Sequence, residues 1–175
     1  MAVIGILLLF VVVPSRKEAA ARPTPDRRDA ATAALTFAQE LAVTGVSQAA
    51  VYGPRLGRIA APGAEARIRA AFGKGAEEVR RLIGETGILR AVPMGYRVDS
   101  FSARAASVSV WMVALAGGSR LEPTAQWRVL TLDLAWTSTG WRVTDGSGGG
   151  GPSPRTPLPL LATEAATFKE PRHVP

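Results

Sequence analysis

The stretch AQWRVLTLDLAWTSTGWRVTD, residues 125–145, decides the fold class of this chain. In its first half, large apolar residues alternate with polar ones, as on an extended strand: Leu130, Leu132, Leu134 and Trp136 on one face, Thr131 and Asp133 on the other. The polar residues 137–140 then lead to a second tryptophan, Trp141. This pattern predicts two antiparallel strands joined by a four-residue hairpin loop, with Trp136 and Trp141 meeting across it.

The same period of two extends over the second half of the chain. Runs rich in β-branched and aromatic residues, separated by turn residues, predict four strands: 96–102, 106–115, 125–136 and 141–145. Short connections between consecutive strands favour an antiparallel meander.

The first half of the chain has a helical period instead. We expect a long helix over about 25–45, with Thr24 as its N-cap and Pro25 at the first helical position. A short helix should occupy about 54–61, and a third should carry one apolar stripe from Ile68 to Ile83 and end at Gly84. Three helices followed by four strands predict an α+β fold, in which the helices cover one face of a curved sheet.

Residues 1–13 are continuously apolar. As a helix they would span roughly 20 Å, less than the ~30 Å hydrocarbon core of a membrane. The segment therefore fits the apolar part of a signal peptide or a short membrane anchor, either cleaved or retained, and a buried element of the domain is the alternative. Export or anchoring would place the main domain outside the cytoplasm.

These observations give a domain plan. It comprises a signal or anchor segment (1–13), a linker (14–23), one α+β domain (24–146), a Gly/Pro-rich linker (147–159) and a C-terminal tail (160–175).

Composition excludes several kinds of site. The 175 residues carry a net charge of +7 but no cysteine, so disulfides and thiolate metal sites are excluded. The basic residues are mixed with acidic ones, as on solvated helices, which does not favour nucleic-acid binding.

Candidates for catalysis are few. The one histidine, His173, lies near the chain end, and the phenols are Tyr52 and Tyr96. The strand carboxylates Asp99, Asp133 and Asp145 have no spacing that forces two of them together. The sequence has no motif typical of a nucleotide-binding loop, a metal site or a catalytic nucleophile. We therefore expect no enzyme activity, catalytic residue, metal or cofactor.

The order of elements resembles the cone-shaped, nuclear transport factor two-like (cystatin-like) fold. The segments PMGYRVDSFSARAASVSVWMVAL (93–115), AQWRVLTLDLAWTSTGWRVTD (125–145) and GGGGPSPRTP (148–157) are similar to actinobacterial membrane proteins related to the conjugation component TcpC and its type IV secretion counterparts. The resemblance covers most of residues 30–155. It implies a membrane-anchored cone domain that works in a transfer or secretion complex.

We therefore expect a non-catalytic assembly module that contacts other membrane-complex subunits, or a copy of itself, through a sheet face or edge. An extracytoplasmic binder of a small apolar ligand in the cone cavity is the alternative. Five aromatic residues are the candidate contacts for a partner or ligand: Tyr96, Trp111, Trp127, Trp136 and Trp141. Each of the tryptophans also fits a simple packing role.

Overall fold

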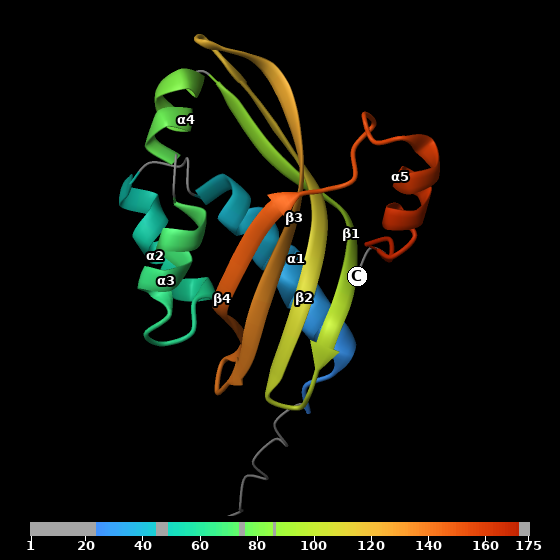
Figure 1. Cartoon of the computed structure of the whole chain (residues 1–175). Coiled ribbons are helices and arrows are strands. Elements are labelled where there is room, and N and C mark those ends of the chain that lie inside the picture. The colour runs from blue at the N-terminus through green and yellow to red at the C-terminus, as the bar shows by residue number, and fades with distance from the viewer. Residues whose placement is uncertain (1–23, 45–48, 74–75, 86, 172–175) are drawn as a thin grey trace, which may run out of the picture.

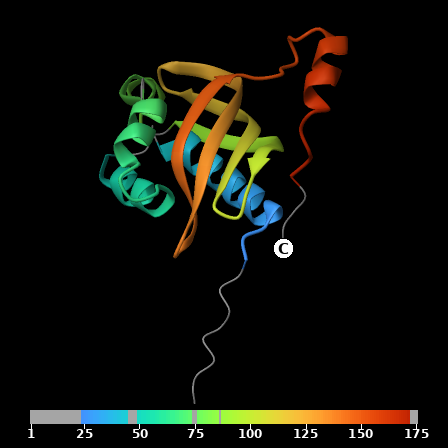
Figure 2. The same ribbon diagram turned by 60° about the horizontal axis from the view of Figure 1, so that its bottom comes forward.

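A four-stranded antiparallel sheet curves around a long helix (Figures 1 and 2). The computed structural model describes residues 24–44, 49–73, 76–85 and 87–171. The strands follow one another in the order of the sequence: β1 (Ile88–Phe101), β2 (Ala105–Gly118), β3 (Leu121–Thr137) and β4 (Gly140–Gly150). The expected α+β fold with a curved antiparallel sheet is confirmed.

Helix α1 (Arg27–Thr44) crosses one face of the sheet, hereafter the inner face (Figure 2). Its buried positions recur every three or four residues and are mostly small: Ala30, Ala34, Ala38 and Leu41. This alanine stripe lets the helix lie close to the sheet. The N-cap differs from the expected one, because the Asp29 amide donates to Asp26 Oδ1 (2.7 Å) and Thr24 lies before the cap.

The helices after α1 differ from expectation in two places. Helix α2 (Ala49–Ile59) begins upstream of the expected start, so Pro54 lies inside it. The expected third helix is two helices, α3 (Glu65–Phe72) and α4 (Ala76–Ile83). At Gly73 the amide still bonds the Arg69 carbonyl (2.7 Å), but a Cβ there would lie 2.6 Å from that oxygen. The helix thus ends at Gly73, within a stripe that periodicity alone reads as continuous.

One core joins the helices to the inner face of the sheet. The sheet contributes alternate residues of its last three strands: Ala106, Val108, Val110 and Met112; Leu130, Leu132 and Leu134; Trp141 and Val143. For β3, this is the face that the alternation of residues 130–136 predicts.

The β3–β4 hairpin has the predicted register, with Trp136 opposite Trp141. Their rings meet edge to face, with centroids 5.3 Å apart. Thr137 and Gly140 are themselves paired, so the loop proper is two residues long instead of four. Gly140 adopts φ +100°, which glycine allows at low cost.

Strand β4 is longer than expected, since it continues through the glycines to Gly150. Residues 147–150, expected in a linker, therefore belong to the sheet. The close packing at residue 146 requires a glycine, because a Cβ there would lie 2.8 Å from the Phe72 ring and 3.0 Å from the Thr131 carbonyl. After β4 the chain leads to helix α5 (Leu158–Ala165), which stands beside β1 (Figure 1).

Candidate protein-interaction surface

The face of the sheet that points away from α1, hereafter the outer face, carries a polar half and an aromatic half. In the polar half, hydroxyl groups link three strands. Ser109, 2% exposed, donates to Asp99 Oδ2 (2.6 Å) and contacts the Thr131 hydroxyl (3.0 Å), and Ser107 donates to Asp133 Oδ1 (2.7 Å). Cross-strand bonds of this kind stabilise a sheet.

Arg97 connects this polar half to the C-terminal segment. Its Nε donates to Asp99 Oδ1 (2.6 Å) and its Nη1 to the Thr167 hydroxyl (3.2 Å). Its guanidinium carbon also lies 5.2 Å from the centre of the Phe168 ring. Asp99 thereby orients the arginine that holds residues 167–168 against the sheet.

Phe168 is the side chain that anchors the C-terminal segment. Its ring centroid lies 5.9 Å from that of Trp111, and its Cβ lies 2.8 Å from where a Cβ of Gly95 would be. Next to it, Lys169 and Tyr96 exchange two backbone hydrogen bonds (2.7 and 2.9 Å) at the free edge of β1. The absence of a side chain at Gly95 therefore makes room for the docked phenylalanine.

The aromatic half of the outer face is centred on Trp111 and Trp127, whose ring centroids are 5.7 Å apart. The chain leaving β4 passes over them: Trp111 Nε1 donates to the Pro152 carbonyl (3.0 Å), and the Gly151 amide donates to the Trp127 carbonyl (3.0 Å). Both tryptophans are half-buried as a result. We expected an open aromatic face, but the chain's own residues 151–169 cover part of it.

Beyond these tryptophans, toward the α4 end of the sheet, large apolar side chains are exposed. Ile88, Val92 and Leu115 are 61%, 44% and 42% exposed. Val92 pairs with Val113, Arg90 pairs with Leu115, and Ile88 pairs with Gly117, so the three exposed residues lie on one face around Arg90. We call Ile88, Val92 and Leu115 the apolar row.

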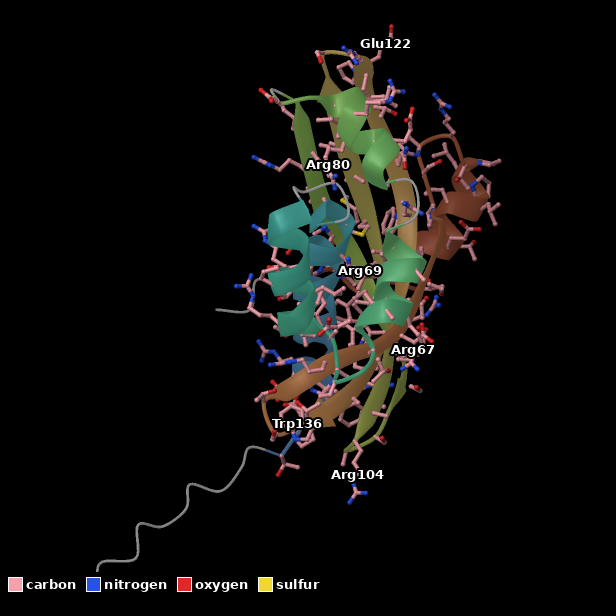
Figure 3. All side chains as sticks on the ribbon, turned by 90° about the vertical axis from the view of Figure 1, so that its left-hand side faces the viewer. Arg67, Arg69, Arg80, Arg104, Glu122 and Trp136 are labelled. Carbon is pink, nitrogen blue, oxygen red and sulfur yellow. The ribbon has the colours of Figure 1, made fainter. Side chains whose placement is uncertain are left out.

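The remaining sequence candidates lie elsewhere. Trp141 is 4% exposed and belongs to the core, which leaves it no surface for a partner, and Trp136 packs half-buried against the same core near one end of the molecule (Figure 3). Tyr96 packs against the core from the edge strand. The five aromatic candidates are thus divided between the two faces and the edge of the sheet. Sequence analysis missed the apolar row, although alternation in β1 and β2 could have placed it on the face opposite the core.

The carboxylates on the strands do not form a pair that lines a cavity. Asp99 faces away from Tyr96, and Asp133 faces away from the Leu130–Trp136 stripe. The register does place Asp133 opposite Asp145, which spacing did not predict, and both are exposed. Among the described residues, no group of three or more Asp, Glu, His or Cys is arranged to hold a metal. His173 and the phenol of Tyr52 lie outside the described residues and side chains.

No protein-family model and no curated protein sequence matches this chain. Solved structures do share its fold. An IcmL-like type IV secretion system protein of Legionella pneumophila is 13% identical, with a TM-score of 0.59, covering 77% of this chain and 100% of that one. A proposed aromatic ring hydroxylase of Novosphingobium aromaticivorans is 15% identical, with a TM-score of 0.52, covering 72% and 90%. The chain therefore has a cone-like fold that proteins with different described roles share.

The apolar segment 1–13 lies outside the described residues. Within the described ranges, the structure has no helix that is both long and apolar enough to cross a membrane.

Proposed function

We propose that this protein is a non-catalytic assembly module whose outer face binds another protein subunit. The apolar row carries the proposal. Three large aliphatic side chains are exposed on the face of the sheet opposite α1, beside two tryptophans. Contiguous exposed apolar surface of this kind is typical of protein contacts, whose centres are enriched in aromatic residues.

The inner face supports this choice over a ligand within the cone. Between α1 and the last three strands, the space is filled by packed side chains, among them Ala34, Val108 and Leu132, each 0% exposed. An apolar ligand would have to displace that core. The alternative of an apolar ligand in the cone cavity is correspondingly less well supported.

We further propose that the module is anchored or exported by residues 1–13 and works in a transfer or secretion complex, as a relative of the TcpC-type proteins. The apolar start of the sequence supports the anchor. The shared fold with an IcmL-like type IV secretion protein is compatible with the assembly role.

Photo-crosslinking in cells tests the interaction surface. A benzophenone amino acid at Leu115 or Val92 of the full chain should give a discrete cross-linked product. The same group at Arg104 should not, because that exposed side chain points away from the molecule near the opposite end of β2 (Figure 3). Equal products from all three positions, or none from any, would contradict the proposal. The mass of the product distinguishes a second copy from another subunit.

A charge-bearing variant provides the matched test. Val92→Lys together with Leu115→Lys should abolish capture of the partner, because burying two ammonium groups without counterions is costly. The fold should persist, as judged by circular dichroism, because both side chains are exposed. Capture that survives in the folded double variant would show that the partner binds elsewhere.

Fractionation tests the anchor separately. We expect the full chain in the membrane fraction, or exported with residues 1–13 removed, and a chain without 1–13 in the cytosol. Full-length protein with an intact N-terminus in the cytosolic fraction would rule the anchor out without bearing on the outer face.

A further inference from the structure

A groove of about 900 Å³ lies between the first half of α1 and strand β1, outside the core. Residues 167–170 of the C-terminal segment form its remaining wall. Three parts of the chain therefore line it: Arg27, Arg28, Ala31, Thr32 and Leu35 of α1; Tyr96, Arg97 and Val98 of β1; Thr167, Lys169 and Glu170. This volume is within the range of small-molecule sites, about 300–1,000 Å³.

The groove is rich in positive charge. Four cationic side chains and one acidic one, Glu170, line it. Arg97 is paired with Asp99, and among the described residues the only hydrogen bond of the Arg27 side chain runs from Nη2 to the Val98 carbonyl, at 3.5 Å. Within the described ranges, Arg28 and Lys169 have no acidic partner.

Two of these cations lie at a position where positive charge is unfavourable. Arg27 and Arg28 begin α1, and the N-terminal end of a helix carries a partial positive charge. Arginines there are repelled by the helix dipole and by each other, and the N-cap Asp26 and the first-turn Asp29 offset this only in part. An anion bound between Arg27, Arg28 and Lys169 would relieve the repulsion.

The rest of the groove is apolar apart from three hydroxyl groups, those of Thr32, Tyr96 and Thr167. Ala31, Leu35 and Val98 contribute aliphatic surface, and Tyr96 is half-buried with its backbone fixed by Lys169. The Tyr96 hydroxyl has no hydrogen-bond partner among the described residues. A ligand here would meet cationic and apolar side chains next to each other, because Arg27 lies beside Val98 and Lys169 is paired with Tyr96.

We infer that this groove binds a small amphiphile with an anionic head, a carboxylate or a phosphate, and an alkyl chain. The head is recognised by Arg27, Arg28 and Lys169, and the chain lies on Leu35, Val98 and the Tyr96 ring. An extended peptide is disfavoured, because the outward backbone groups of Tyr96, where an added strand would pair, are already bonded to Lys169. This inference does not depend on the outer face binding a partner.

Isothermal titration of the purified full chain with octyl phosphate and octanoate tests it. We expect saturable binding of both and much weaker binding of octanol, which lacks the charge, and of inorganic phosphate, which lacks the chain. The variant Arg28→Gln/Lys169→Gln should weaken octyl phosphate binding by at least about tenfold, because it removes two charged hydrogen-bond donors to the head group. Arg120→Gln, an exposed arginine at the β2–β3 turn, is the matched control and should change nothing.

Three results would overturn the inference. If octanol binds as tightly as octyl phosphate, the negative charge does not contribute. If inorganic phosphate binds as tightly, the alkyl chain does not contribute. Unchanged affinity of the Arg28→Gln/Lys169→Gln variant, with an unchanged circular dichroism spectrum, would place the ligand outside the groove.

Discussion

Trp141 contacts Phe101 and Trp136 from within the core, with ring centroids 6.1 and 5.3 Å away. Its Nε1 is buried and has no partner in the described part of the chain. The ring therefore contributes through packing, and its polar atom adds a cost.

We expect Trp141→Ala to lower the free energy of unfolding by about 3–5 kcal/mol, the usual loss for a large buried aromatic. Trp141→Phe should cost clearly less, because it keeps a ring and removes the unpaired N–H. Urea unfolding of both variants followed by circular dichroism measures the difference. A near-zero loss for the alanine variant would contradict the assignment of Trp141 to the core.

Gly95 is the second residue with a specific prediction. Gly95→Ala would place a Cβ 2.8 Å from Phe168 Cβ and 3.1 Å from the Lys169 carbonyl. The C-terminal segment should therefore detach from Trp111, and hydrogen exchange at the Lys169 amide should accelerate. Gly149→Ala is the control, because no atom lies within 4 Å of its Cβ position. Unchanged hydrogen exchange at the Lys169 amide in the Gly95→Ala variant would show that the C-terminal segment accommodates the methyl group and stays docked.

At the scale of elements, β4 and α3 depend on the glycine at 146. Gly146→Val would force the Phe72 ring and the helix that carries it away from the sheet. We expect a loss of about 1–3 kcal/mol, as for other overpacked sites. Gly149→Val should be neutral or slightly stabilising, because valine favours strands. Thermal unfolding of the two variants checks this, and equal effects would show that Gly146 is not sterically required.

For the whole molecule, one core predicts one unfolding transition. Residues of α1, α2, α3 and three strands belong to the same buried cluster. Curves for helix loss (circular dichroism) and for tryptophan exposure (fluorescence) should therefore coincide in urea. A separate, earlier loss of helix signal would show that the helices are a distinct unit.

The sequence alone determined the α+β class, the four-stranded meander, and the inner-face positions of Leu130 to Trp136, because alternation and turn residues are local signals. The Trp136–Trp141 pair followed from the same pattern. Local signals were misleading at glycines and prolines. They placed Pro54 at a helix start, took one helix across Gly73, and read residues 147–150 of the strand as part of a linker.

Only the tertiary structure decided which tryptophans share a face and what covers them. Trp111 and Trp127 lie opposite the core, and residues 151–169, distant in sequence, dock onto them through Phe168. The groove likewise combines the start of α1, the edge of β1 and the C-terminal segment. Residues up to 143 positions apart in the sequence (Arg27 and Glu170) line this groove, and no local period of the sequence records how the chain brings them together.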